Sequence, residues 1–429
     1  MKKVMLKSTL SLAVAMASSQ LFASGFALNE QDVAGMGTGF AGRSSSAENA
    51  STVYGNPAGM ARLEGQQITG GFAVIDASTD IKDARGNASG TNKGDMVPFT
   101  AVPFGFYTNK LNDQWAVGFG VYAPFGLITD YESNFQGRAF GSKSEVQVIS
   151  FQPTVSYAFN DRVSIGFGPT INRIAGTLES EPSLGALIPG TGDNRIKVKG
   201  DDTALGFNAG ILVQATDTTR VGLTYHSKVK YKLKGHTEVT PGAGVPPSLL
   251  ANGRYDASLN VDTPESWDLS VTQDMNDAWK VYAGATWTRW SRLKDITVNN
   301  EGVTTAGGVL APGIVGSIKE EQNWHDTWAY ALGTSYRITK QVVLRTGLTF
   351  DQSPTNNTDR SPRIPTGDRT IFSLGLGYDV MPNMTVDLAY SYLKEEPVKV
   401  AHTNALGQGY SAKYKNSANG FGLGVTYKF

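Results

Sequence analysis

From about residue 66 to the last residue, apolar and polar side chains alternate along the chain. The run that ends the chain shows apolar residues at every second position: Phe421, Leu423, Val425, Tyr427 and Phe429. Successive side chains of a β-strand point to opposite faces, so each run predicts a strand with one apolar and one polar face. The runs reach about ten residues, the length that a tilted membrane-spanning strand needs. The pattern therefore favours a transmembrane β-barrel over a soluble β-sandwich.

The links between these runs alternate between short and long, which gives a strand count. Short, turn-like links fall at 109–113, 160–162, 216–219, 273–277, 338–341 and 380–383. Long polar links rich in glycine and proline fall at 81–97, 126–145, 178–202, 235–255, 296–323, 352–368 and 394–409. These links predict an all-β fold, an antiparallel barrel of about 14 strands over residues 66–429. Lipid cannot pair an open sheet edge, so the barrel must close, with its short turns in the periplasm.

Composition removes several other classes of protein. The chain has no cysteine, which excludes disulfide scaffolds and thiolate metal sites. Lys+Arg and Asp+Glu are equal at 38 each, which disfavours a nucleic-acid-binding protein. Outside the N-terminus, no stretch approaches the roughly 20 apolar residues of a membrane-spanning helix. We therefore expect no metal, no cofactor and no nucleic-acid partner.

Residues 1–23 have the composition of a secretory signal peptide. Lys2, Lys3 and Lys7 form a basic region, and the short apolar stretch 10–17 is followed by small residues. We place the cleavage after Ala23, although the leucine three residues before that bond departs from the usual small residue. An exported chain without cysteine and with strand-length apolar runs is typical of the bacterial cell envelope.

Residues 24–65 lack the alternation and are rich in glycine and alanine. A barrel of 14 strands encloses a lumen wide enough to leak unless it is filled. A compact segment just ahead of the first strand is a natural plug, or hatch, for that lumen. The alternative is a disordered periplasmic extension, but the segment carries apolar residues that give it something to bury: Phe26, Leu28, Met36, Phe40, Val53, Tyr54 and Met60.

All seven tryptophans fall at or near the ends of predicted strands: Trp115, Trp267, Trp279, Trp287, Trp290, Trp324 and Trp328. This position predicts an aromatic girdle at the membrane interfaces, with ordinary packing inside the barrel as the alternative. Four lysines alternate with apolar residues between 228 and 234, which places them on the face opposite the apolar one. They point inward if the alternation keeps its phase, or they form a rim that faces solvent or lipopolysaccharide.

Several motifs resemble the FadL-type long-chain fatty acid transporters of the bacterial outer membrane. The N-terminal SGFALNE is followed about 30 residues later by Tyr-Gly-Asn-Pro-Ala. TPESW (263–267), RWS (289–291), ALGTSYR (331–337) and RTGLTFDQSP (345–354) follow in matching order. The resemblance implies a fourteen-stranded barrel, a small hatch, and passive uptake of hydrophobic molecules through an opening in the wall. Some members of the family pass aromatic hydrocarbons rather than fatty acids, and this alternative stays open.

The resemblance also implies roles for residues of the N-terminal segment. Phe26 and Leu28 match positions that line the ligand pocket, with a purely structural role as the alternative. Asn56, Pro57 and Ala58 match the signature of the hatch. Proline fixes its backbone and asparagine can cap a turn, so these residues suit a rigid turn against the barrel wall.

The third predicted strand carries the candidate lateral gate. Alternation over 115–121 is interrupted by Ala123, Pro124, Phe125 and Gly126. Proline removes a hydrogen bond from the ladder and glycine loosens the strand, so a kink and a gap are expected here. The family has its wall opening in this strand, which makes the same four residues the expected exit for the ligand.

A fatty acid carboxylate would require a cation in an apolar setting. Members of the family use an arginine on the fifth strand and a lysine ahead of the ALGTSYR block. This chain offers Arg173 a few residues from the first position and Lys319, beside Glu320 and Glu321, near the second. Both are departures from the family pattern. They are the possible carboxylate contacts, and the lysines at 228–234 are an alternative.

Two other kinds of outer-membrane protein compete with a transporter. An enzyme would need a catalytic motif, but the four histidines stand in no nucleophile motif and no G-x-S-x-G is present. An open porin would lack a plug. We therefore expect no catalytic residues, and a monomer whose partners are a long-chain fatty acid or another hydrophobic ligand, outer-membrane lipid and lipopolysaccharide.

Overall fold

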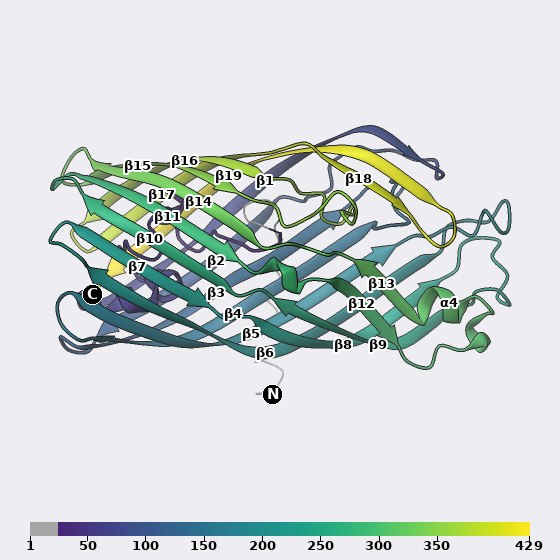
Figure 1. The fold of residues 1–429 in the computed structure, drawn as a ribbon, viewed down its shortest axis with the longest axis horizontal. Helices are drawn as coiled ribbons and strands as arrows, with labels where there is room; N and C mark the ends of the chain where they lie inside the picture. Colours follow the sequence, from purple (N-terminus) through teal and green to yellow (C-terminus); the bar gives the residue numbers. More distant parts are fainter. Residues whose placement is uncertain (1–24) are drawn as a thin grey trace.

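The computed structural model describes residues 25–429, and the predicted signal peptide of residues 1–23 lies outside the described residues. The chain forms a closed antiparallel barrel, because β1 pairs with β2 on one side and with β19 on the other (Figure 1). Five crossings of the barrel wall, here called spans, are each built from two consecutive strand elements. The 19 strand elements therefore make 14 spans. The predicted fold class and strand number are confirmed.

The first six spans are single strands: β1 (Gln66–Gly86), β2 (Thr100–Lys110), β3 (Trp115–Asp130), β4 (Lys143–Ala158), β5 (Val163–Ser180) and β6 (Arg195–Gln214). Four divided spans follow: β7 (Thr219–His226) with β8 (Val229–Thr240), β9 (Gly253–Thr263) with β10 (Ser266–Asp274), β11 (Trp279–Thr288) with β12 (Asp295–Asn300), and β13 (Ser317–Glu321) with β14 (Thr327–Arg337). The last spans are β15 (Val342–Asp351), β16 (Arg369–Met381), β17 (Met384–Glu395) with β18 (Val398–Thr403), and β19 (Gly409–Lys428).

Short helices lie at the N-terminus, in the break between β11 and β12, and in the loop between β12 and β13. They are α2 (Val33–Gly37), α3 (Thr52–Gly55), η1 (Pro57–Arg62), η2 (Trp290–Arg292), η3 (Thr305–Gly307) and α4 (Ala311–Val315). None of the helices in the part of the chain that the structure describes is long and apolar enough to cross a membrane.

Several strands run further into the predicted long links than the sequence indicated. β1 continues to Gly86, β3 to Asp130, and β6 begins at Arg195. Their outer residues carry many charged and polar side chains, and they stay in register with neighbouring strands. An antiparallel ladder needs only backbone partners, so it can continue beyond the lipid, where apolar periodicity stops being required. The long loops are correspondingly shorter than predicted.

The alternation changes phase where a span is divided. In β7, Val221 and Tyr225 lie on the outer face, whereas in β8 the apolar Tyr231 and Leu233 are buried on the lumen side. The two residues between β7 and β8 interrupt the strand and exchange its faces. The lysines of β8 therefore point outward, and the alternative that placed them in the lumen is wrong.

Five of the seven tryptophans form the predicted girdle on the outer face. Trp267, Trp287 and Trp328 are register partners on adjacent strands at one membrane interface. Trp115 and Trp279 lie near the short turns at the other end. The remaining two, Trp290 and Trp324, are 1% and 2% exposed, and they pack inside the barrel. They follow breaks between strands, where position along the sequence no longer indicates which face a side chain takes.

The N-terminal segment, residues 25–65, folds inside the barrel near the short-turn end (Figure 1). Asn56 fixes it by donating from Nδ2 to the carbonyls of Ser44 (2.7 Å) and Ile211 (3.0 Å). Its Oδ1 accepts from the backbone of Ala58, the start of η1, with Pro57 as the first helical residue. The wall opposite is glycine-rich because a β-carbon would overlap the backbone or side chains of the segment at these positions: Gly166, Gly210, Gly222, Gly284, Gly333, Gly347 and Gly375.

Candidate functional site

An apolar cavity lies in the lumen on the long-loop side of the N-terminal segment. Its empty space is about 930 Å³, partly open to solvent. Phe26 lines it, and the Phe26 ring lies 4.9 Å from the ring of Trp290 and 5.9 Å from that of Trp324, measured between centroids. The cavity is lined mainly by aliphatic side chains, among them Leu127, Val146, Ile174, Leu178, Val198, Leu233, Leu259, Val261, Leu293, Ile296, Val298 and Ile364. Such a surface is suited to an apolar chain.

One inward-facing cation borders this cavity, and sequence reasoning missed it. Of the two charged residues that line it, Lys199 has its side chain exposed on the outer face, whereas Arg363 is buried. The guanidinium of Arg363 donates from Nη1 to Ser144 Oγ (2.9 Å) and from Nε to Glu320 Oε2 (3.0 Å). Among the described residues, Nη2 has no hydrogen-bond partner. Arg363 belongs to the loop between β15 and β16, where no periodicity indicates a direction.

The two predicted carboxylate contacts lie elsewhere. Arg173 is on the outer face of β5, and its Nη2 is 2.6 Å from Asp201 Oδ2. Lys319 is on the outer face of β13, with its Nζ 2.6 Å from Glu321 Oε1. Both side chains are about half exposed, and each already has a carboxylate partner. The structure brings neither cation to the cavity.

The side chain of Leu28 is also separated from that of Phe26, although only Ala27 lies between them in the sequence. Its side chain is 1% exposed and belongs to a different apolar cluster, with Ile75, Val102 and Ala123. Phe26 lies in a turn, where the alternation of an extended strand does not apply, and the two side chains join different apolar clusters. Of the two predicted pocket residues, only Phe26 lines the cavity.

The barrel wall has a break between β2 and β3. Their ladder ends at the pair Gly105 and Val121, although β2 continues to pair with β1 as far as Thr100. Pro103 on β2 and Pro124 on β3 lie just beyond the last pair, and proline has no N–H to donate. β3 also shifts its register against β4 between Tyr122 and Phe125. The predicted kink at residues 123–126 thus coincides with a gap in the hydrogen-bonded wall.

The N-terminal segment occupies the edge of β3 that β2 leaves free. Leu28 N donates to Pro124 O (2.8 Å), and Gly126 N donates to Phe26 O (2.9 Å). Between these two bonds, Ala27 and Phe125 form an isolated antiparallel bridge. The backbone that carries the cavity residue Phe26 and the kinked backbone of β3 are therefore one hydrogen-bonded unit.

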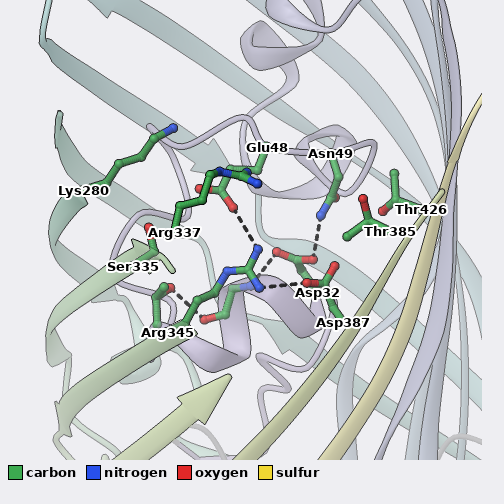
Figure 2. A network of polar contacts seen from close by, with 12 residues as sticks. Asp32, Glu48, Asn49, Lys280, Ser335, Arg337, Arg345, Thr385, Asp387 and Thr426 are labelled. Atoms are coloured by element: carbon green, nitrogen blue, oxygen red, sulfur yellow. Dashed lines mark hydrogen bonds and ion pairs between the residues drawn. The ribbon is translucent and has the colours of Figure 1, made fainter. Parts of the chain in front are cut away.

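A polar chamber lies on the other side of the N-terminal segment, toward the short turns (Figure 2). Its empty space is about 1210 Å³, and half of its lining residues are charged. At its inner end Arg345 Nη1 donates to Asp387 Oδ1 (2.8 Å), and Arg345 Nη2 lies 3.7 Å from Glu48 Oε2. Asn49 Nδ2 donates to Asp32 Oδ1 at 3.1 Å. This network connects the N-terminal segment to β15 and β17.

Comparison with known proteins agrees with this architecture. The chain is 28% identical to a long-chain fatty acid transport protein of Escherichia coli O6:H1, over all of this chain and 99% of that protein. It is also 28% identical to outer membrane protein P1 of Haemophilus influenzae, over 99% of each chain. The crystal structure of a Pseudomonas aeruginosa FadL homologue superposes with a TM-score of 0.84 at 29% identity, covering 95% of this chain and 100% of that one.

A more distant structure, the Pseudomonas putida toluene transporter TodX, has a TM-score of 0.72 at 19% identity, covering 96% of this chain and 99% of that one. At that identity the likeness shows the shared fold alone. The family model described as outer membrane protein transport protein (OMPP1/FadL/TodX) matches residues 14–429. The chain belongs to this family of outer-membrane transport proteins for hydrophobic substrates, and its resemblance to the FadL-type transporters is confirmed.

Proposed function

We propose that the protein takes up long-chain fatty acids, or similar hydrophobic molecules with a polar head, and does so as a passive monomeric transporter without catalysis. The ligand is captured in the apolar cavity beside Phe26 and leaves sideways through the break between β2 and β3. The observation that carries this proposal is the end of the β2–β3 ladder at Gly105 and Val121, directly beside the backbone of Phe26.

The contrast between cavity and chamber supports a lateral exit. Each CH₂ group transferred from an apolar site to water costs about 0.8 kcal/mol. A chain of some sixteen carbons that crossed the charged chamber around Arg345 would forfeit on the order of 10 kcal/mol by that rule. Leaving through the wall into lipid avoids this cost, because the chain passes from one apolar surface to another.

In this proposal residues 24–65 are the hatch and residues 66–429 the barrel. The hydrogen bonds of Asn56 and the close approach of the segment to the glycines of the wall support that division. Deleting residues 27–62 should leave an insertable barrel with raised ion conductance in planar bilayers. A folded deletion variant with unchanged, near-zero conductance would refute the hatch, and high conductance of the intact protein would favour an open porin.

We assign the head-group contact to Arg363 rather than to Arg173 or Lys319. Arg363 is buried at the edge of the cavity, and its Nη2 is not used by the described residues. A hydrogen bond to a charged group contributes about 1.5–3 kcal/mol. Replacing Arg363 by glutamine should therefore weaken palmitate binding about tenfold to a hundredfold, with a much smaller effect on a long-chain alcohol. If small aromatic hydrocarbons bind more tightly than palmitate and R363Q changes neither affinity, aromatic transport is the better account.

The lateral exit can be tested with a reversible lock. Ala27 and Phe125 face one another between two flanking hydrogen bonds, the antiparallel geometry in which Cα atoms lie about 4.5 Å apart. That spacing suits a disulfide, and the chain has no cysteine to interfere. An A27C/F125C variant should fold and lose uptake when it is oxidised, because its N-terminal segment can no longer leave β3. Reduction should restore uptake.

The matched control is a disulfide between two strands that stay paired. Val117 on β3 and Val155 on β4 are register partners, so V117C/V155C should transport equally well with and without reductant. Uptake is measured with labelled palmitate in vesicles or cells. Wild-type uptake by fully oxidised A27C/F125C would refute the exit at this break and favour an axial path past the hatch.

A further inference from the structure

A row of lysines stands on the outer surface of β8. Lys230, Lys232 and Lys234, here called the lysine ridge, are all exposed, and the apolar residues between them are buried on the lumen side. Alternate residues of a strand lie about 6.6–6.8 Å apart. The ridge is therefore a line of three regularly spaced positive charges on the outside of the barrel.

The amines of the ridge are not paired within the described part of the chain. None of the three makes an ion pair or a hydrogen bond there, although Asp262 lies opposite Lys230 and Asp201 opposite Lys234 in the register. Asp202 Oδ2 accepts from the backbone N–H of Lys232 (2.7 Å) and not from its amine. Four cations on neighbouring strands of the same surface each have a carboxylate within ion-pairing distance: Arg173, Arg195, Lys197 and Arg254. These four cations are thus neutralised locally, whereas no amine of the ridge is within ion-pairing distance of a carboxylate of the described residues.

The height of the ridge is set by the aromatic girdle. The outward rings of Tyr225 and Trp267 lie 4.6 Å apart, and such aromatic residues mark the membrane interface. β8 begins at Val229, four residues beyond Tyr225 on the side away from the short turns. The ridge therefore lies just outside the apolar band on the extracellular side. At that level the outer leaflet presents the phosphate groups of lipopolysaccharide.

We propose that the lysine ridge is a binding site for the lipid A phosphates of lipopolysaccharide. The argument is one of charge complementarity: three exposed amines that make no ion pair among the described residues face the layer in which the phosphates lie. The site is on the outer face, whereas the cavity is in the lumen, so bound lipopolysaccharide would anchor this side of the barrel without entering the transport path. Because this binding depends on charge, it should weaken as the salt concentration rises.

The test compares two triple variants that lose the same charge. K230Q/K232Q/K234Q removes the ridge, and K82Q/K319Q/K413Q removes three exposed lysines that already have carboxylate partners. Binding of labelled lipid A to the purified full-length proteins is measured in neutral detergent. Each lysine near an anionic lipid surface contributes about 1 kcal/mol, and 1.4 kcal/mol is a factor of ten. The ridge variant should bind about a hundredfold more weakly at low salt, and the control should stay within about threefold of wild type by the same constants.

Dephosphorylated lipid A should bind wild type and ridge variant equally weakly. Inorganic phosphate should compete only at concentrations far above those of lipid A. Equal affinity of both triple variants for lipid A would overturn the proposal, and so would competition by inorganic phosphate at equal concentration, since the site would then be one for free anions. The gel shift between unheated and boiled protein verifies that each variant is folded.

Discussion

The cavity beside Phe26 and the chamber around Arg345 occupy the same lumen and are separated only by the N-terminal segment. The cavity is lined by aliphatic and aromatic side chains with one inward cation, whereas half of the chamber lining is charged. Both surfaces come from inward-facing positions of the same barrel, so their difference depends on the residues placed at each height. A lumen with one apolar end and one charged end disfavours the passage of an apolar molecule along its axis. This difference supports the lateral exit that we propose at the break in the wall.

The largest effect is expected from removing the charge of Arg345 at the inner end of the chamber. Arg345 is buried, with Asp387 and Glu48 beside it. Replacing it by methionine leaves these carboxylates without their counter-charge, and breaking a buried pair in this way costs about 3–5 kcal/mol. R345M should lower the free energy of unfolding by that amount in a denaturant titration in detergent. It should leave palmitate affinity within about twofold, because the cavity is untouched.

The matched control for R345M is the same substitution at Arg337, which lines the same chamber. Arg337 is 44% exposed and its Nη1 lies 3.4 Å from Asp379 Oδ2. An exposed pair contributes about 0–1 kcal/mol, so R337M should be close to wild type in stability. Equal losses in the free energy of unfolding of R345M and R337M would show that the buried ion pairs of Arg345 contribute no more to stability than the exposed pair of Arg337.

The second effect concerns Glu30, which lies between the two regions. Burial raises the pKa of its carboxyl from 4.5 to about 7, partly offset by backbone hydrogen bonds from Glu30 and Asn29 and by the charge of Arg43. A raised pKa means that the folded state holds the proton more tightly than the unfolded state. The stability that this proton contributes is therefore fully present below about pH 4.5 and is lost as pH rises through about 7. The loss is on the order of 3 kcal/mol, at 1.36 kcal/mol for each pKa unit.

Glutamine cannot lose that proton, so E30Q should be more stable than wild type at pH 8 and nearly equal to it at pH 4. Unfolding titrations at both pH values measure this difference. A wild-type protein whose stability does not fall relative to that of E30Q between pH 4.5 and 7 would contradict the assignment.

A third and smaller effect should appear in ligand affinity. Ile174 lines the cavity, whereas Ile171 on the same strand faces lipid. Truncating Ile174 to alanine removes about three carbons of contact, and at about 0.8 kcal/mol per CH₂ this costs up to roughly 2 kcal/mol. I174A should bind palmitate about tenfold or more weakly, measured by fluorescence displacement. I171A should bind as wild type does, and equal losses in both would place the ligand outside the cavity.

The smallest effect is expected at the outer face. Arg173 pairs with Asp201 in solvent, and such pairs contribute about 0–1 kcal/mol to stability. R173Q should therefore change neither the free energy of unfolding nor palmitate affinity by more than about that amount. A loss of affinity in R173Q comparable to that in R363Q would return the head-group role to the strand position that the sequence suggested.

The pattern of residue types determined the barrel, its 14 spans, and the position of the kink at residues 123–126. These features depend on local rules: a period of two, turn residues at short links, and proline where a ladder must be interrupted. The motif Asn56-Pro57-Ala58 also folds as a local rule predicts, with the asparagine side chain capping the turn that proline begins.

Only the tertiary structure decided which face the key side chains take. Periodicity indicates shared faces only within an uninterrupted strand, and each break between paired elements can reset the phase. For this reason the lysines of β8 face outward, Trp290 and Trp324 lie in the lumen, and Lys319 lies outside it. Arg173 lies on the uninterrupted β5, where its phase with the outward Ile171 places it on the outer face. Arg363 could not be found from sequence, because a long loop brings it into the cavity and its direction is fixed by contacts with Ser144 and Glu320, distant along the chain.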